Sequence, residues 1–169
     1  MEKLFNLIAT IDWGIVIAFV AILLTIMTIR DQRKHNKLSV RPIAIISVAD
    51  YEDRLAVNLQ NQGTGPLIIE KISIINNNEI RSSIIEFFDT DFEDITWSTF
   101  IGDIDGWAIL PGSQRTLIEI VGDSRDKKFI AKRNRVRKVL ANLKIEVRYC
   151  DIYEQKMPIK VRSLDFFAR

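Results

Sequence analysis

Few side chains in this sequence are suited to chemistry. Its 169 residues include one histidine, His35, and one cysteine, Cys150. A zinc site takes about four Cys, His or carboxylate ligands, and a catalytic triad takes a base held beside its nucleophile. Cys150 alternates out of phase with the apolar residues before it, so we interpret it as a buried structural thiol. The sequence predicts no catalytic residue, no metal site, no cofactor and no enzyme activity.

Carboxylates are concentrated between Ser82 and Gln114, where there are seven acidic residues and no Lys or Arg. A calcium loop would place ordered oxygen ligands around a central glycine, but no glycine follows this acidic run until Gly102. Aromatic residues alternate with the carboxylates. The stretch is therefore either an excursion whose rings cap one end of the domain, or a docking surface for a partner. The candidate docking residues are Phe88, Asp91, Phe92 and Trp97.

A second charged stretch, from Arg125 to Arg148, has ten basic residues and two acidic ones. Apolar residues recur in it at helical spacing, which predicts a basic amphipathic helix over residues 126–140, capped by Asp123 or Ser124. Its charged face is either solvated or binds an anionic surface. Beside a membrane, each Lys or Arg contributes about 1 kcal/mol of attraction to anionic lipid, and nucleic acid is the competing partner. The candidate contact residues are Lys132, Arg133, Arg135 and Arg137.

The segment that must position these features is an uncharged run of seventeen residues, Trp13 to Ile29. As a helix it spans about 25 Å, close to the thickness of a bilayer's hydrocarbon core. A signal peptide is the main alternative, but positive charge follows this run rather than preceding it, and no small-residue cleavage site follows Ile29. We therefore predict a single transmembrane helix over residues 13–29.

Basic residues are concentrated on the C-terminal side of this segment. Lys3 precedes it, whereas four basic residues follow it directly: Arg30, Arg33, Lys34 and Lys37. By the positive-inside rule, the C-terminal domain should be cytoplasmic and the protein a single-pass protein of the plasma (inner) membrane. The four residues are also candidate contacts for anionic lipid headgroups.

Short Ile- and Val-rich runs separated by turns follow the anchor and predict about seven strands. We expect Gly63 and Gly65 to supply positive φ angles in a tight turn. The predicted fold is mainly β, an antiparallel immunoglobulin-like β-sandwich with one inserted basic helix, preceded by the transmembrane helix. The predicted segments are an interfacial segment (1–12), the transmembrane helix (13–29), a basic juxtamembrane linker (30–38) and the β-sandwich domain (39–169).

Three short motifs carry a family resemblance: Asn61-Gln62-Gly63-Thr64-Gly65-Pro66, Leu110-Pro111-Gly112 and Tyr149-Cys150-Asp151. With them, the chain resembles uncharacterised bacterial single-span membrane proteins that have a small immunoglobulin-like domain. The chain departs from their D-x-x-G hairpin at Glu154. The resemblance implies the fold and the anchor.

Two functional hypotheses follow. The first is a membrane-tethered, non-enzymatic interaction domain with a protein partner, an accessory or sensor subunit of a bacterial membrane assembly. The alternative is a cytoplasmic ligand or nucleic-acid sensor that uses the basic helix 126–140.

Overall fold

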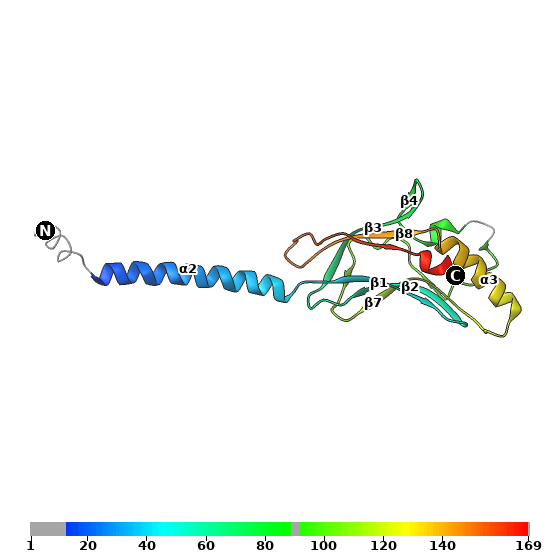
Figure 1. Cartoon of the computed structure of the whole chain (residues 1–169), viewed down its shortest axis with the longest axis horizontal. Helices are drawn as coiled ribbons and strands as arrows, with labels where there is room; N and C mark the ends of the chain where they lie inside the picture. The colour runs from blue at the N-terminus through cyan, green and yellow to red at the C-terminus, as the bar shows by residue number, and fades with distance from the viewer. Residues whose placement is uncertain (1–12, 89–91, 169) are drawn as a thin grey trace, which may run out of the picture. The chain divides into compact units, whose positions relative to one another are not determined.

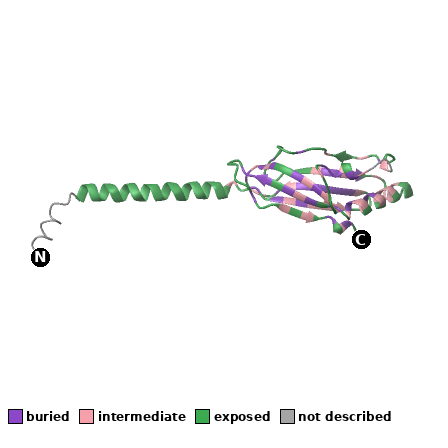
Figure 2. Ribbon diagram, turned by 90° about the horizontal axis from the view of Figure 1, so that it is seen from above, coloured by how far each residue is buried: buried purple, intermediate pink, exposed green. Residues whose placement is uncertain are grey.

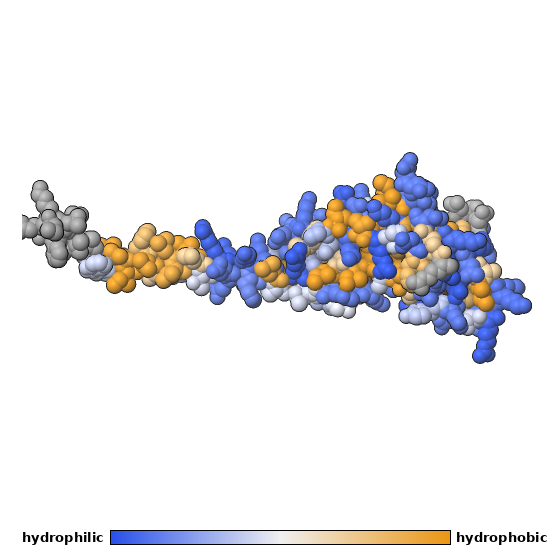
Figure 3. All heavy atoms as spheres, in the orientation of Figure 1, coloured by the Kyte–Doolittle hydropathy of each residue, from blue (hydrophilic) through white to orange (hydrophobic). Residues whose placement is uncertain are grey.

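The computed structural model describes residues 13–88 and 92–168, and the chain divides after Ser39 into two units. The first unit contains helix α2, Trp13–Ser39. Every residue of α2 is exposed (Figure 2). Among the described residues, α2 is the one helix long and apolar enough to cross a membrane. Figure 3 shows its apolar part in orange, followed by a blue, basic part.

Helix α2 is longer than the sequence predicted. We expected a helix over 13–29 and a separate basic linker over 30–38, but the helix continues through this segment to Ser39. Arg, Lys and Gln have high helix propensity, so the basic segment extends the helix instead of ending it. The predicted interfacial segment, residues 1–12, lies outside the described residues.

The second unit contains two antiparallel sheets (Figure 1). The first has the strand order β1-β2-β7-β5. Its strands are β1 (Ala44–Asp50), β2 (Arg54–Asn61), β7 (Gln114–Val121) and β5 (Thr99–Phe100). The second has the order β4-β3-β8-β9, and β6 also pairs with β3. Its strands are β3 (Leu67–Asn76), β4 (Glu79–Arg81), β6 (Ala108–Ile109), β8 (Lys144–Cys150) and β9 (Lys160–Ser163). The prediction of a mainly β domain is confirmed.

Both sheets contribute to one hydrophobic core. In β8, Ile145, Val147 and Tyr149 are buried, as their alternation predicted. Strand β2 differs, because its residues are buried on both faces from Leu55 to Leu59. It lies between β1 and β7, and Ala56 is fully buried.

Helix α3, Lys127–Leu140, lies between β7 and β8 in the chain and confirms the predicted basic helix. The predicted caps were wrong. The side chain of Asp126 accepts a hydrogen bond from the backbone N–H of Lys128 (2.8 Å), whereas Asp123 accepts one from Arg125 in the preceding turn. Val136 and Leu140 of α3 are buried, and the helix packs against the short 3-10 helix η3, Asp165–Ala168. A second 3-10 helix, η1, spans Ile85–Phe87.

A buried amide, Asn61, organises the end of the domain that contains its first residue, Val40. Its side-chain N–H groups donate to the carbonyls of Gly65 (2.7 Å) and Ile109 (2.9 Å). Its side-chain oxygen accepts from the backbone N–H groups of Gly63 (2.9 Å) and Ile43 (3.3 Å). Asn61 is fully buried, so this one side chain joins the start of β1, the β2–β3 turn and β6.

The two glycines of the β2–β3 turn have a different role from the one expected. Positive φ occurs at Gly106 and Gly112 but not at Gly63 or Gly65. A Cβ atom on Gly65 would overlap the carbonyl oxygen of Val40, and one on Gly63 would overlap that of Arg41. Glycine is therefore needed because the incoming backbone crosses this turn in direct contact.

We predict that Gly65→Ala destabilises the domain by about 2 kcal/mol or more, because the incoming backbone must move. Gly102→Ala is the matched control, since a Cβ atom there meets nothing within 4 Å, and it should change stability by less than about 0.5 kcal/mol. Urea unfolding of the full chain in detergent, followed by tryptophan fluorescence, measures both. Equal midpoints would contradict the role assigned to the crossing.

Candidate functional site

The acidic stretch and the basic helix meet at one end of the domain. The Asp94 carboxylate forms ion pairs with Arg135 (3.1 Å) and Lys132 (3.6 Å) of α3. The Lys132 ammonium also donates to the backbone carbonyl of Asp94. The sequence presented the two stretches as separate charged surfaces, whereas in the structure they partly neutralise each other.

The electrostatics of Asp94 reflect this contact. Desolvation on its own raises the pKa of the carboxyl. The hydrogen bond from Arg135 and the positive charges of Arg135 and Lys132 outweigh it, and they lower the pKa below its ordinary value. These contacts favour the ionised form of Asp94, and they hold the acidic stretch against α3.

An aromatic cluster adjoins this ion pair. The ring of Phe88 lies edge-on to Phe92 (5.0 Å between centroids) and to Trp97 (4.7 Å), an arrangement that the ring quadrupoles favour. The guanidinium of Arg135 lies 4.9 Å from the centroid of the Phe92 ring, within the range of a cation–π contact. Arg135 therefore joins the charged and the aromatic parts of the contact.

The other predicted contact residues of α3 also face the domain. Arg137 forms an ion pair with Asp50 at 3.2 Å. The side chains of this pair are 18% and 11% exposed, so much of its charge is removed from water. Arg133 donates to the backbone carbonyls of Tyr51 (2.7 Å) and Glu52 (2.8 Å), in the β1–β2 turn. The structure thus gives Lys132, Arg133, Arg135 and Arg137 contacts within the domain that hold α3 in place. The sequence presented the charged face as either solvated or a candidate contact for an anionic surface.

A groove remains open on the aromatic cluster. Its volume is about 220 Å³. The residues that line it are Ile85, Phe88, Phe92, Glu93, Trp97 and Phe100. Three of the four predicted docking residues are therefore brought together, and the fourth, Asp91, lies outside the described residues. Phe100 is 53% exposed at the groove.

Sequence reasoning missed Ile85, Glu93 and Phe100 as groove residues. Helices and strands reveal a shared face through their periodicity. The described residues between η1 and β5, 88 and 92–98, are mostly irregular, so the residue spacing did not indicate which side chains share a surface. The density of aromatic residues was the available signal.

A larger hollow, of about 600 Å³, lies between α3 and η3. Its lining residues are Asn134, Arg137, Lys138, Ala141, Asn142, Phe167 and Ala168. They offer amide and cationic groups but no carboxylate, thiol or hydroxyl side chain. This hollow can therefore hold an anion.

The residues considered for chemistry lie apart from both hollows. Cys150 is buried, and burial, together with the negative charges of Glu70 and Asp151, raises the pKa of its thiol. The prediction of a buried thiol is confirmed. His35 lies on α2 and is exposed. Among residues 13–88 and 92–168, no group of three or more His, Cys, Asp or Glu side chains is arranged to hold a metal ion.

Four basic residues follow the apolar segment and lie on the exposed C-terminal part of α2: Arg30, Arg33, Lys34 and Lys37. They are on the same helix as the apolar run and directly follow it. Their placement agrees with a role beside a bilayer, which stays a prediction.

No protein-family model, no curated protein and no solved structure matches this chain.

We predict that Arg137→Ala destabilises the domain by about 2 kcal/mol, because Asp50 is left mostly buried without its partner. Lys138→Ala, at the neighbouring exposed position, should change stability by less than about 0.5 kcal/mol. The free energy of unfolding in urea measures the difference. If both variants unfold at the same denaturant concentration, the Arg137–Asp50 ion pair does not hold α3 in place.

Proposed function

We propose that this protein is a membrane-tethered, non-enzymatic interaction module, an accessory or sensor subunit of a bacterial membrane assembly. The observation that carries the proposal is the aromatic groove of Phe88, Phe92, Trp97 and Phe100. It lies on a rigid β domain that follows a helix able to cross a bilayer. The resemblance to bacterial single-span proteins agrees with this role.

The strand order supports an immunoglobulin-like sandwich. In constant-type immunoglobulin domains one sheet has the order ABED and the other contains CFG. When β1, β2, β3, β4, β5, β7, β8 and β9 are lettered A, B, C, C′, D, E, F and G, the two sheets of this chain have the orders ABED and C′CFG. Helix α3 then occupies the E–F connection. Such domains commonly serve as scaffolds for recognition by their loops.

The size and composition of the groove favour a protein partner. Pockets for drug-sized ligands have volumes of about 300–1,000 Å³, whereas this groove has about 220 Å³. That volume suits a large apolar side chain of a partner, and aromatic residues are enriched at the centres of protein interfaces. The rings of Phe88, Phe92 and Trp97 are held by contacts with each other and with Arg135, so binding costs little ordering of these three side chains.

The second candidate function is the cytoplasmic sensor of an anionic ligand or nucleic acid. The hollow beside α3 favours it, because Arg137 and Lys138 line it together with two asparagine amides. Its weakness is that Arg137 already pairs with Asp50. If a nucleotide or RNA co-purifies with the chain and is lost in Lys138→Glu, this function replaces the first.

The groove proposal predicts which variant loses a partner. Phe100→Asp should greatly reduce the protein that co-purifies with the full chain in mild detergent, because a charge is placed beside the groove. Ile80→Asp is the matched control, since Ile80 is also exposed (65%) and lies outside the groove. A partner retained equally by both variants would show that the groove is not the docking site.

The proposed orientation predicts a cytoplasmic C-terminus. A reporter fused after Arg169 should be active only in its cytosolic form, because the four basic residues after the apolar run resist translocation. Neutral substitutions of Arg30, Arg33, Lys34 and Lys37 should weaken this bias. Periplasmic alkaline phosphatase activity from the wild-type fusion would overturn the orientation.

A further inference from the structure

The end of the domain that contains Val40 exposes several large apolar side chains. We call it the Val40 end, and it consists of residues 40–43, 62–66, 107–115 and 151–159. Hydrogen bonds bring these loops together. The N–H of Gln62 donates to Ile43 (2.9 Å), and that of Asn61 donates to Ser113 (3.0 Å). The β8–β9 turn joins the same end, because Cys150 is in register with Ile68 near the start of β3.

Six large apolar or aromatic side chains are exposed at the Val40 end. Their exposed fractions range from 44% for Trp107 to 64% for Leu110. The six are Ile43, Trp107, Leu110, Ile152, Tyr153 and Ile159. Single exposed apolar residues are ordinary, but several at one end of a small domain indicate an interaction surface. They come from three separate loops and the start of β1, so their gathering results from the fold and not from one apolar run in the sequence.

Basic residues accompany these side chains. Arg41, Arg115 and Lys156 are exposed at the Val40 end, against one exposed acid, Glu154. The carboxylate of Asp151 is buried and accepts hydrogen bonds from backbone N–H groups of its own turn. The guanidinium of Arg115 lies 5.7 Å from the centroid of the Trp107 ring. The surface therefore combines apolar side chains, a Trp, a Tyr and a small excess of positive charge.

Chain length limits how far this surface lies from the proposed membrane span. Ten residues, Arg30–Ser39, separate the apolar run from Val40, and they are helical. Ten helical residues extend about 15 Å.

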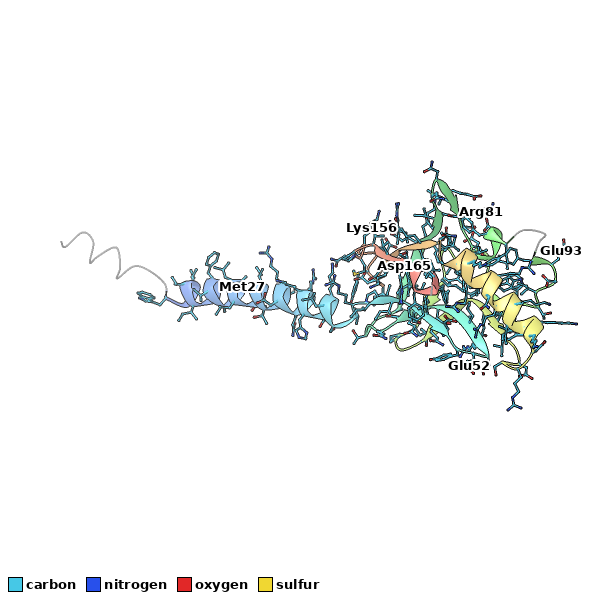
Figure 4. The ribbon with its side chains drawn as sticks, turned by 45° about the vertical axis from the view of Figure 1, so that its right-hand side comes forward. Met27, Glu52, Arg81, Glu93, Lys156 and Asp165 are labelled. Carbon is cyan, nitrogen blue, oxygen red and sulfur yellow. The ribbon has the colours of Figure 1, made fainter. Side chains whose placement is uncertain are left out.

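Helix α3 lies at the opposite end of the strands from the Val40 end. Ala44 begins β1 at the Val40 end, and Asp50, which pairs with Arg137 of α3, ends it. Seven strand residues extend about 23 Å, which separates α3 from the Val40 end within the domain. Figure 4 shows the same separation within the domain, with Lys156 toward one end and Glu52 and Glu93 toward the other.

We propose that the Val40 end is an interfacial membrane-contact surface, occupied by the anionic bilayer that the transmembrane helix spans. Trp107 and Tyr153 suit the headgroup level, where amphipathic rings are enriched. The isoleucine and leucine side chains suit burial in the interfacial region, as in interfacial membrane binding. Arg41 and Lys156 contact anionic headgroups. This proposal rests on the proposed membrane span, and it assigns the lipid contact to the end of the domain opposite α3.

The experiment uses the full chain in nanodiscs of phosphatidylcholine and phosphatidylglycerol. Single-tryptophan variants retain Trp13, Trp97 or Trp107, and the other two tryptophans are replaced by Phe. Brominated phospholipid quenches the fluorescence of an indole that contacts lipid. Trp13 reports on the span, Trp107 on the Val40 end, and Trp97, at the aromatic groove, is the matched control within the same domain. We expect bromination to quench Trp13 and Trp107 but not Trp97.

The outcomes separate this proposal from the span on which it rests. Quenching of Trp13 without quenching of Trp107 overturns the proposal and leaves the span intact. A Trp13 that bromination does not quench overturns the span itself. If Trp107 is shielded from aqueous acrylamide but is not quenched by lipid, a second protein chain covers this surface and the proposal fails. With quenching established, Arg41→Gln combined with Lys156→Gln should reduce it in anionic nanodiscs, and unchanged quenching would overturn the headgroup contact.

Discussion

The arrangement of the domain depends on one buried amide. Asn61 uses both N–H groups and its carbonyl oxygen to join the start of β1, the β2–β3 turn and β6. Because the residue is fully buried, loss of this side chain would leave several backbone groups without partners or water, which is costly. The same amide fixes the path of the chain at Ile43, just before β1. It also brings together three of the four segments of the Val40 end, residues 40–43, 62–66 and 107–115.

The opposite end of the domain is held by charge instead of by a single amide. Asp94 binds Lys132 and Arg135, while Arg137 binds Asp50. These contacts connect an irregular, aromatic stretch and the β1–β2 region to one helix. Individual exposed ion pairs stabilise little, but these pairs act with a cation–π contact and with the buried residues Val136 and Leu140. These contacts lie beside the aromatic groove, and Arg135 reaches one of its rings, Phe92.

Local patterns explain which features could be predicted from the sequence. The apolar run of α2, the spacing of Phe129, Val136 and Leu140, and the alternation in β8 each depend on neighbouring residues, and each prediction agrees with the structure. The pairing of Asp94 with Lys132 joins residues 38 positions apart, and no sequence period connects them. The glycines of the β2–β3 turn were recognised, but the reason they are needed, contact with the backbone of Val40 and Arg41, depends on the tertiary fold.

The tertiary contacts of α3 change how its basic residues are interpreted. A basic helix in a protein proposed to span a membrane suggests an electrostatic contact with lipid. In the folded domain, Lys132, Arg133, Arg135 and Arg137 bind groups of the domain itself, so each would lose these contacts on moving to an external anion. The Val40 end has fewer cations, but they accompany exposed Trp, Tyr, Ile and Leu side chains. Apolar burial adds to electrostatic attraction at a membrane interface. The Val40 end is therefore a better candidate for lipid contact than α3, although it has fewer basic residues.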